Sequence, residues 1–208
     1  MSNDVTIIDY GLGNIRSVQN MIKKIGCNSI ISSDTNVILN SKKLILPGVG
    51  SFGKGMNNLK SKGLINTLNE KVLNDQTPIL GICLGMQLMT KFSEESNLEG
   101  LDWIDAKTIK FQKSNMSDEY KIPHMGWSEI DIKKRSNCFV NVDKEQRFYF
   151  THAYHVKCQD DSNVLATTKY GYNFTSAFIK DNIVGVQFHP EKSHVFGMQF
   201  FKNFILEF

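Results

Sequence analysis

The sequence predicts an α/β protein with an open, mostly parallel, twisted sheet, helices on both faces, and an antiparallel extension in the C-terminal half. In the first half of the chain, short apolar runs alternate with segments of helical periodicity. The second half contains short segments rich in aromatic and β-branched residues. The 208 residues, 41% of them hydrophobic, suffice for one substantial core, so we expect a single domain over residues 1–208.

The first half repeats a strand, a glycine-containing turn and a helix. The predicted strands are residues 5–9, 44–46 and 79–82. The helix after the first strand carries Ile15, Val18 and Ile22 at helical spacing and ends at Gly26. Such alternation favours parallel strands covered on both faces.

From about Trp103 the pattern changes to shorter strands. The predicted strands are residues 147–150, 164–168, 176–179 and 183–187, and we assign them to the antiparallel extension. The last segment, residues 195–208, reads as a helix whose phenylalanines favour core packing over a binding surface.

The composition argues against several classes of protein. The formal net charge is only +3, which gives no electrostatic reason to expect nucleic acid or an anionic membrane as a partner. Apolar runs such as residues 78–82 fall far short of the roughly 20 residues of a membrane-spanning helix. Since the N-terminus also lacks a signal-peptide pattern, we expect a cytoplasmic protein. The four cysteines are scattered, which favours reduced thiols.

One of these cysteines has the surroundings of a nucleophile. Cys83 stands in the segment GICLG, between glycines, where a buried strand turns into a helix. This arrangement matches a nucleophile elbow, in which small neighbours permit a sharp turn that exposes the reactive atom. A helix N-terminus and a nearby histidine would favour the thiolate. The alternative is a buried structural thiol in a helix-capping turn.

A base and a group to orient it occur in the segment QFHPEKS. His189 and Glu191 follow an apolar strand, and ligands of open parallel sheets bind beyond the carboxyl ends of the strands. A surface turn is the alternative for this triplet.

Attack on an amide creates an oxyanion, which requires unobstructed backbone donors. The loop at residues 47–50, PGVG, fits this need, so an amide of Val49 or Gly50 together with that of Leu84 would form the oxyanion hole. A plain glycine-rich turn between a strand and a helix is the alternative.

Taken together, PGVGSF, GICLGMQL and FHPEKS resemble the class I, triad-type glutamine amidotransferases. IDYGLGN, KIPHMGW and FYFTHAY extend the resemblance over nearly the whole chain to the glutaminase subunits of imidazole glycerol phosphate synthase, an enzyme of histidine biosynthesis.

The resemblance implies a triad of Cys83, His189 and Glu191 that hydrolyses L-glutamine to glutamate and ammonia. It implies glutamine contacts near Gly48, Gly50 and Gln87, and ammonia passing through a channel to a (β/α)₈-barrel cyclase subunit. That partner would make imidazole glycerol phosphate and AICAR.

The same resemblance places Tyr154 and Lys192 on the side of the partner or near the channel mouth. No cofactor is implied.

Two positions depart from the family pattern. Ser128 stands where asparagine is usual, and His194 stands where glycine is usual. Such changes resemble paralogues that supply ammonia for amidation of a surface-polysaccharide sugar, which is the alternative pathway. A non-catalytic regulatory subunit and a cysteine peptidase or amidase are alternatives of other classes.

Two further patterns carry little weight. The spacing of His152, His155 and Cys158 suggests a metal site, but along a strand it alternates between faces, so we expect no metal. GLGNIR lacks the third glycine of a dinucleotide fingerprint, so we expect no nicotinamide cofactor either.

Overall fold

The computed structural model describes residues 5–142 and 145–208. The strands are β1 (Val5–Ile8), β2 (Ser29–Ser32), β3 (Leu44–Gly48), β4 (Ile79–Cys83), β5 (Thr90–Ser93), β6 (Leu98–Glu99), β7 (Ile104–Lys110), β8 (His124–Ile132), β9 (Gln146–His152), β10 (Tyr154–Cys158), β11 (Val164–Tyr170), β12 (Tyr172–Lys180) and β13 (Ile183–Val186). The α-helices are α1 (Ile15–Lys24), α2 (Thr35–Leu39), α3 (Phe52–Ser61), α4 (Leu64–Asn69), α5 (Leu84–Leu88) and α6 (His194–Leu206). A π-helical turn, η1 (Glu70–Asn74), and short 3-10 segments, η2 (Lys113–Asn115), η3 (Asn137–Phe139), η4 (Asp161–Asn163) and η5 (Pro190–Lys192), complete the elements.

The strands form one mixed sheet in the order β2-β1-β3-β4-β13-β12-β10-β7-β5-β6, while β11, β8 and β9 continue from β12 as a side branch. From β2 to β13 the pairings are parallel, and the pairs of β12 with β13, β10 and β11 are antiparallel. The predicted fold class, a mostly parallel sheet with an antiparallel C-terminal part, is confirmed.

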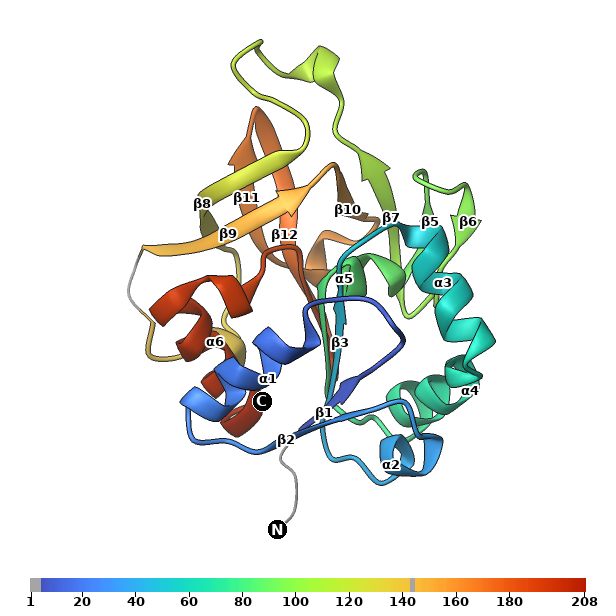
Figure 1. Ribbon diagram of the computed structural model, residues 1–208. Helices are drawn as coiled ribbons and strands as arrows, with labels where there is room; N and C mark the ends of the chain where they lie inside the picture. The colour runs from blue at the N-terminus through green and yellow to red at the C-terminus, as the bar shows by residue number, and fades with distance from the viewer. Residues whose placement is uncertain (1–4, 143–144) are drawn as a thin grey trace.

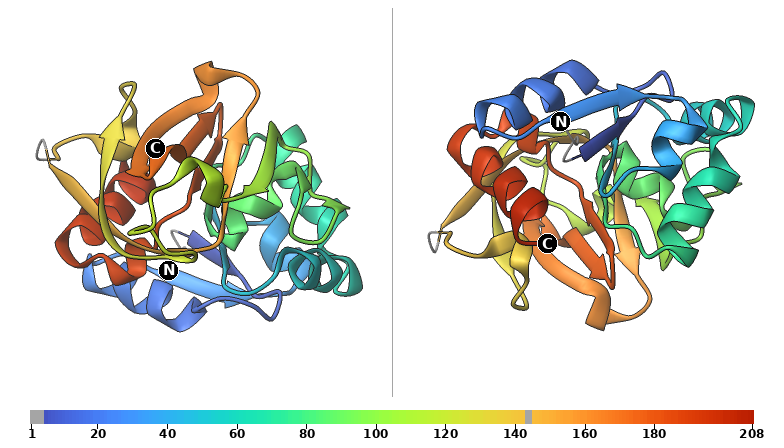
Figure 2. Two further views of the ribbon diagram at one scale, coloured as in Figure 1. Left: turned by 90° about the horizontal axis from the view of Figure 1, so that it is seen from above. Right: turned by 90° about the horizontal axis from the view of Figure 1, so that it is seen from below.

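Helices cover both faces of the parallel strands. In Figure 1, α1 and α6 lie together on one side of β1 and β3, and α2, α3 and α4 lie on the other. Both views of Figure 2 show the same separation. Each layer has its own apolar core, one including Val18 and Phe204, the other Leu59 and Leu68. Because both faces are covered, all residues of β1, β3, β4 and β13 are buried.

Strand β13 departs from the sequence prediction. Residues 183–187 are assigned to the antiparallel extension by their sequence pattern, but β13 pairs in parallel with β4 and is antiparallel only to β12. The reason is the direction of the chain, since β12 runs back against the parallel strands and the following strand therefore runs with them. β13 thus joins the two halves of the sheet.

The predicted terminal helix is present as α6. Its residues Phe200, Phe201 and Phe204 are almost fully buried, so the expectation that its phenylalanines pack in the core is confirmed for these three. All four cysteines are buried thiols, none of them in a disulfide. Within the described ranges, no helix combines the length and apolar character needed to cross a bilayer.

Candidate active site

Cys83 lies at a sharp turn between β4 and α5. Its φ of 52° and ψ of −107° are unusual for a residue other than glycine, as expected of a nucleophile elbow. The turn needs glycine on both sides. A Cβ at Gly81 would lie 2.8 Å from the backbone nitrogen of Met86, and one at Gly85 would lie 1.7 Å from the carbonyl oxygen of Leu46.

The helix after Cys83 is short. The pattern after Cys83 predicts a helix through Leu88 and Met89, and α5 covers five residues to Leu88 with Met89 as its C-cap. So few aligned peptide units carry only a small dipole. His189 is the charged group whose interaction with Cys83 the structure shows.

His189 and Glu191 follow the carboxyl end of β13, the strand next to β4. The Nδ1 atom of His189 lies 2.8 Å from Oε1 of Glu191, and both side chains are about 98% buried or more. Two hydrogen bonds fix the backbone of His189. Its amide donates to the carbonyl of Tyr149 at 2.8 Å, and its carbonyl accepts from the Ser193 hydroxyl at 2.6 Å. The Nε2 atom has no other hydrogen-bond partner within the described residues, and its electrostatic partner is Cys83.

Burial alone would lower the pKa of His189. The negative charge of Cys83, a hydrogen bond to Cys83 and the Glu191 carboxylate outweigh this effect and raise the pKa to about 10. His189 is therefore a cation at neutral pH, and the pair it forms with Cys83 is lost as the pH rises through that value.

We expect Glu191→Gln to lower the pKa of His189, because the amide keeps a hydrogen-bond acceptor but removes the carboxylate charge. In the wild-type protein the raised pKa stabilises the fold below about pH 6.5, and this stabilisation disappears as the pH rises toward 10. NMR titration of the ring measures the pKa. His155, whose pKa burial lowers to about 4, is the internal control and keeps its titration curve. An unchanged pKa of His189 would contradict the assignment.

A pocket of about 230 Å³ lies in front of the nucleophile. The predicted residues that line it are Val49, Gly50, Cys83, Leu84, Gln87, Tyr154 and His189. The structure therefore brings the proposed oxyanion loop, nucleophile and base to one place. Gly50 has a φ of +129°, a conformation that favours glycine, and Val49 beside it is 46% exposed.

Three predicted residues lie outside this pocket lining: Glu191, which contacts His189 as described above, Gly48 and Lys192. Gly48 is buried at the end of β3, where an added Cβ would lie 2.6 Å from the Tyr10 hydroxyl and 2.7 Å from Cβ of Leu84. Its role in the structure is to let the loop pass close to the nucleophile turn. Lys192 is exposed, and its ammonium lies 5.6 Å from the centre of the Tyr149 ring.

The two positions that depart from the family pattern, His194 and Ser128, each contact an aromatic or histidine ring. His194 has a φ of +46°, which explains why glycine suits this position, and its ring stacks on Trp127 with centroids 5.6 Å apart. The Ser128 hydroxyl lies 3.0 Å from Nε2 of His124.

Several residues at the site escape prediction from sequence. Gln187 is fully buried, and its Nε2 atom lies 3.6 Å from the sulfur of Cys83. The available signal is a polar residue at the end of the apolar predicted strand 183–187, two residues before His189. Glu95 also lines the pocket, where its carboxylate accepts a hydrogen bond of 2.7 Å from the amide of Phe52.

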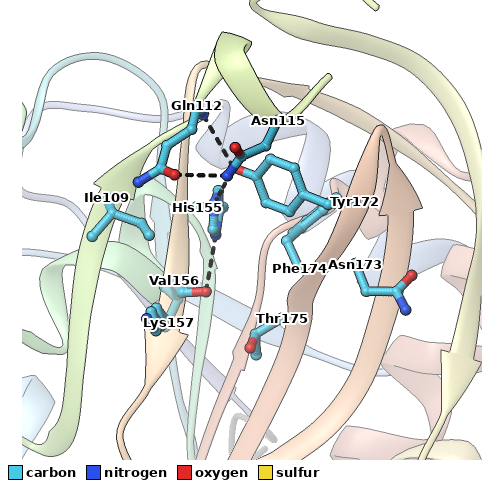
Figure 3. Close-up of a pocket in the computed structure, with 10 residues that line it drawn as sticks. All are labelled: Ile109, Gln112, Asn115, His155, Val156, Lys157, Tyr172, Asn173, Phe174 and Thr175. Carbon is cyan, nitrogen blue, oxygen red and sulfur yellow. Dashed lines mark hydrogen bonds between the residues drawn. The ribbon is translucent and has the colours of Figure 1, made fainter. Parts of the chain in front are cut away.

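Figure 3 shows the residues that line a second pocket, of about 270 Å³. This pocket shares no lining residue with the first. There Nε2 of His155 lies 2.9 Å from the Tyr172 hydroxyl. His152 lines the Cys83 pocket instead, so the two histidines of the possible metal motif face different cavities. Among the residues that the structure describes, no three His, Cys, Asp or Glu side chains are grouped to hold a metal ion.

Comparisons with known proteins identify the family. The family model described as "Glutamine amidotransferase class-I" matches residues 6–208. Imidazole glycerol phosphate synthase subunit HisH 2 of Methanococcus maripaludis is 55% identical over 201 residues, covering 97% of this chain and 98% of that protein. The HisH 2 subunit of Pseudomonas aeruginosa is 43% identical with the same coverage, and the HisH subunit of Sulfurimonas denitrificans is 44% identical over 96% of each chain.

Solved structures support the fold. A crystal structure of a glutamine amidotransferase superposes with a TM-score of 0.76 at 15% identity, covering 98% of this chain and 97% of that one. The structure of PurLQS from Thermotoga maritima gives a TM-score of 0.74 at 17% identity, covering 99% and 98%. The chain belongs to the class-I glutamine amidotransferases and, within them, to the family of HisH subunits.

Proposed function

We propose that this chain hydrolyses L-glutamine to glutamate and ammonia and delivers the ammonia to the cyclase subunit of imidazole glycerol phosphate synthase. The observation that carries the glutaminase step is the meeting of Cys83 and His189 in one pocket, with the buried Glu191 carboxylate 2.8 Å from Nδ1 of His189. The names of the relatives, at up to 55% identity over nearly the whole chain, support the synthase as the destination.

The proposed reaction begins with attack of the Cys83 thiolate on the carboxamide carbon of glutamine. Negative charge moves to the carboxamide oxygen, which the amides of Leu84 and of Val49 or Gly50 stabilise. The His189 cation gives its proton to the nitrogen as the C–N bond breaks, so ammonia leaves and a glutamyl thioester remains. Water then loses a proton to His189 and attacks the thioester, which releases glutamate and restores the ion pair.

Two further groups suit the rest of the glutamine molecule. Gln87 lines the pocket with an amide, and Glu95 brings the negative charge that a substrate ammonium group requires. In this proposal Glu95 contacts the α-ammonium group, which turns the carboxamide end toward Cys83.

Released ammonia is lost to the synthase if it reaches bulk water and is protonated. In this proposal a (β/α)₈-barrel cyclase subunit therefore docks over the pocket, with Tyr154 and Lys192 on the side that it covers. The exposed Val49 and the glycine conformation at Gly50 leave the oxyanion loop able to change its backbone conformation when a partner docks.

We expect the isolated chain to hydrolyse glutamine slowly and to accelerate when the cyclase subunit and its acceptor substrate bind. The measurement is glutamate release with and without the partner, together with formation of imidazole glycerol phosphate from glutamine or from added ammonium chloride. Equal glutamate release in both conditions would contradict the coupling.

The second candidate is amidation of a surface-polysaccharide sugar with a cyclase-like partner. His194, where glycine is usual, is the observation that favours it. Failure to support synthesis of imidazole glycerol phosphate, with intact glutaminase activity, would select this candidate. If no complex of the chain turns over glutamine, the remaining alternative is a non-catalytic regulatory subunit.

A further inference from the structure

A series of hydrogen-bonding side chains runs from β8 to the nucleophile. The Ser128 hydroxyl lies 3.0 Å from Nε2 of His124, and Nδ1 of His124 lies 3.3 Å from Nε2 of His152. The series continues from Nδ1 of His152, which lies 2.7 Å from the carbonyl oxygen of Tyr154. His152 lines the Cys83 pocket, but neither histidine takes part in the proposed reaction.

The same Tyr154 carbonyl leads on to Cys83. It accepts a second hydrogen bond, of 3.0 Å, from Nε2 of Gln87. Gln87 also donates to Oε1 of Gln187 at 3.1 Å, and Nε2 of Gln187 reaches the Cys83 sulfur at 3.6 Å. The series is therefore continuous from a half-buried hydroxyl to the reactive sulfur.

The Tyr154 carbonyl determines which atom donates in each hydrogen bond of His152 and His124. A carbonyl oxygen only accepts, so Nδ1 of His152 carries the proton and Nε2 of its neutral ring accepts. Nδ1 of His124 must then donate to that Nε2, which leaves Nε2 of His124 as an acceptor for the Ser128 hydroxyl. Both rings are fixed in the tautomer with the proton on Nδ1.

The surroundings hold both rings neutral and still. His124 is 1% exposed and lies between Phe150 and Tyr170, whose rings stack on it at centroid distances of 4.8 and 3.9 Å. His152 is 6% exposed. Burial lowers the pKa of His124 to about 4. Burial also holds the pKa of His152 well below its usual value, and neighbouring histidines add to this effect while the hydrogen bond to the Tyr154 carbonyl opposes it.

We propose that His124 and His152 are positioning residues whose directed hydrogen bonds hold the Tyr154 carbonyl, and through it Gln87 and Gln187, in register with Cys83. This role rests on the proposed glutaminase function. The carbonyl fixes the Gln87 amide at the wall of the pocket, and Gln187 holds the sulfur. If the series breaks at His152, Gln87 keeps only part of its support and aligns glutamine less well.

The test compares two alkylating agents on the full-length chain. The glutamine analogue 6-diazo-5-oxo-L-norleucine must be aligned in the pocket before it labels Cys83, whereas iodoacetamide reports the reactivity of the thiolate without recognition. We expect His152→Phe to slow labelling by the analogue about tenfold, the effect of one lost buried hydrogen bond, and to change iodoacetamide labelling less than about twofold. His152→Asn keeps an N–H donor for the Tyr154 carbonyl, so we expect it to recover most of the loss.

The matched control is His155→Phe. This ring is also buried, at 4% exposure, but it lines the second pocket and takes no part in the series, so analogue labelling should stay at the wild-type rate. Equal effects of His152→Phe and His155→Phe, or equal damage by His152→Phe and His152→Asn, would overturn the proposal.

A second measurement needs no substitution. Nitrogen-15 NMR of the histidine rings reports which nitrogen carries the proton, and we expect Nδ1 in both His124 and His152. A proton on Nε2 of either ring would overturn the proposed direction. If the wild-type chain shows no preference for the analogue over iodoacetamide, the proposed glutaminase function fails. If the wild-type chain prefers the analogue and His152→Phe keeps that preference, only the proposed role of the hydrogen-bond series is contradicted.

Discussion

Cys83→Ala abolishes glutamine hydrolysis, with an expected fall in kcat of about 10⁴-fold or more, because loss of a covalent nucleophile removes the thioester route altogether. The substitution removes a sulfur atom from a side chain that is only 6% exposed, and alanine keeps the Cβ that the turn already accommodates. In complex with its synthase partner, the variant should still support synthesis from added ammonium chloride. Glutamate release and product formation from ammonium are the two measurements.

Cys158→Ala is the control for this experiment. Cys158 is another buried thiol, and burial raises its pKa to about 11, so it stays protonated and unreactive at neutral pH. It lies on β10 but does not line the Cys83 pocket, and the variant should turn over glutamine at the wild-type rate. Retained glutamine turnover in Cys83→Ala would remove Cys83 from the mechanism.

Gly85→Ala should destabilise the protein by about 3 kcal/mol or more, because its Cβ would overlap the backbone of β3. The added atom would lie 1.7 Å from the carbonyl oxygen of Leu46, and neither the strand nor the elbow can move without breaking the pairing of β3 with β4. For a chain of this size we expect a fall in Tm of about 6 to 12 °C. Thermal unfolding followed by circular dichroism measures it.

Gly53→Ala provides the comparison, since this glycine also lies in a helix that follows a strand. Its added Cβ would lie 2.9 Å from the Ser96 hydroxyl, the end of a small side chain, rather than from a strand backbone. We expect a change of less than about 1 kcal/mol. If both variants unfold at the wild-type temperature, the close approach of the elbow to β3 is not a constraint on the fold.

The sequence predicts the parallel half of the fold well, because its strands are buried on both faces and read as continuous apolar runs. The pairing of β13 is not predictable in this way. Apolar residues 183–186 fit either half of the sheet, and the choice depends on the direction in which β12 returns to the core. Long-range pairing of this kind leaves no local pattern.

At the site, residues with a reactive group in a special backbone setting are predictable. Cys83 between glycines and His189 beyond a strand are of this kind, and the structure places both at one pocket. Gln187 is harder to find because its hydrogen bonds reach Gln87 and Cys83, which lie 100 and 104 residues away in the chain. His152 is harder to find because its partner ring, His124, lies 28 residues away on another strand. A glutamine within an apolar strand is the only local sign.

The parallel pairing of β4 with β13 sets the positions of the nucleophile and the base relative to one another along the sheet. Ile82 is paired with Val186, so the nucleophile comes one residue after this pair and the base three residues after it. A slip of one residue would shift His189 along the sheet by roughly 3.3 Å, more than the length of a hydrogen bond. Backbone hydrogen bonding between the two strands therefore sets how far apart the nucleophile and the base lie along the sheet, before any side chain adjusts their contact.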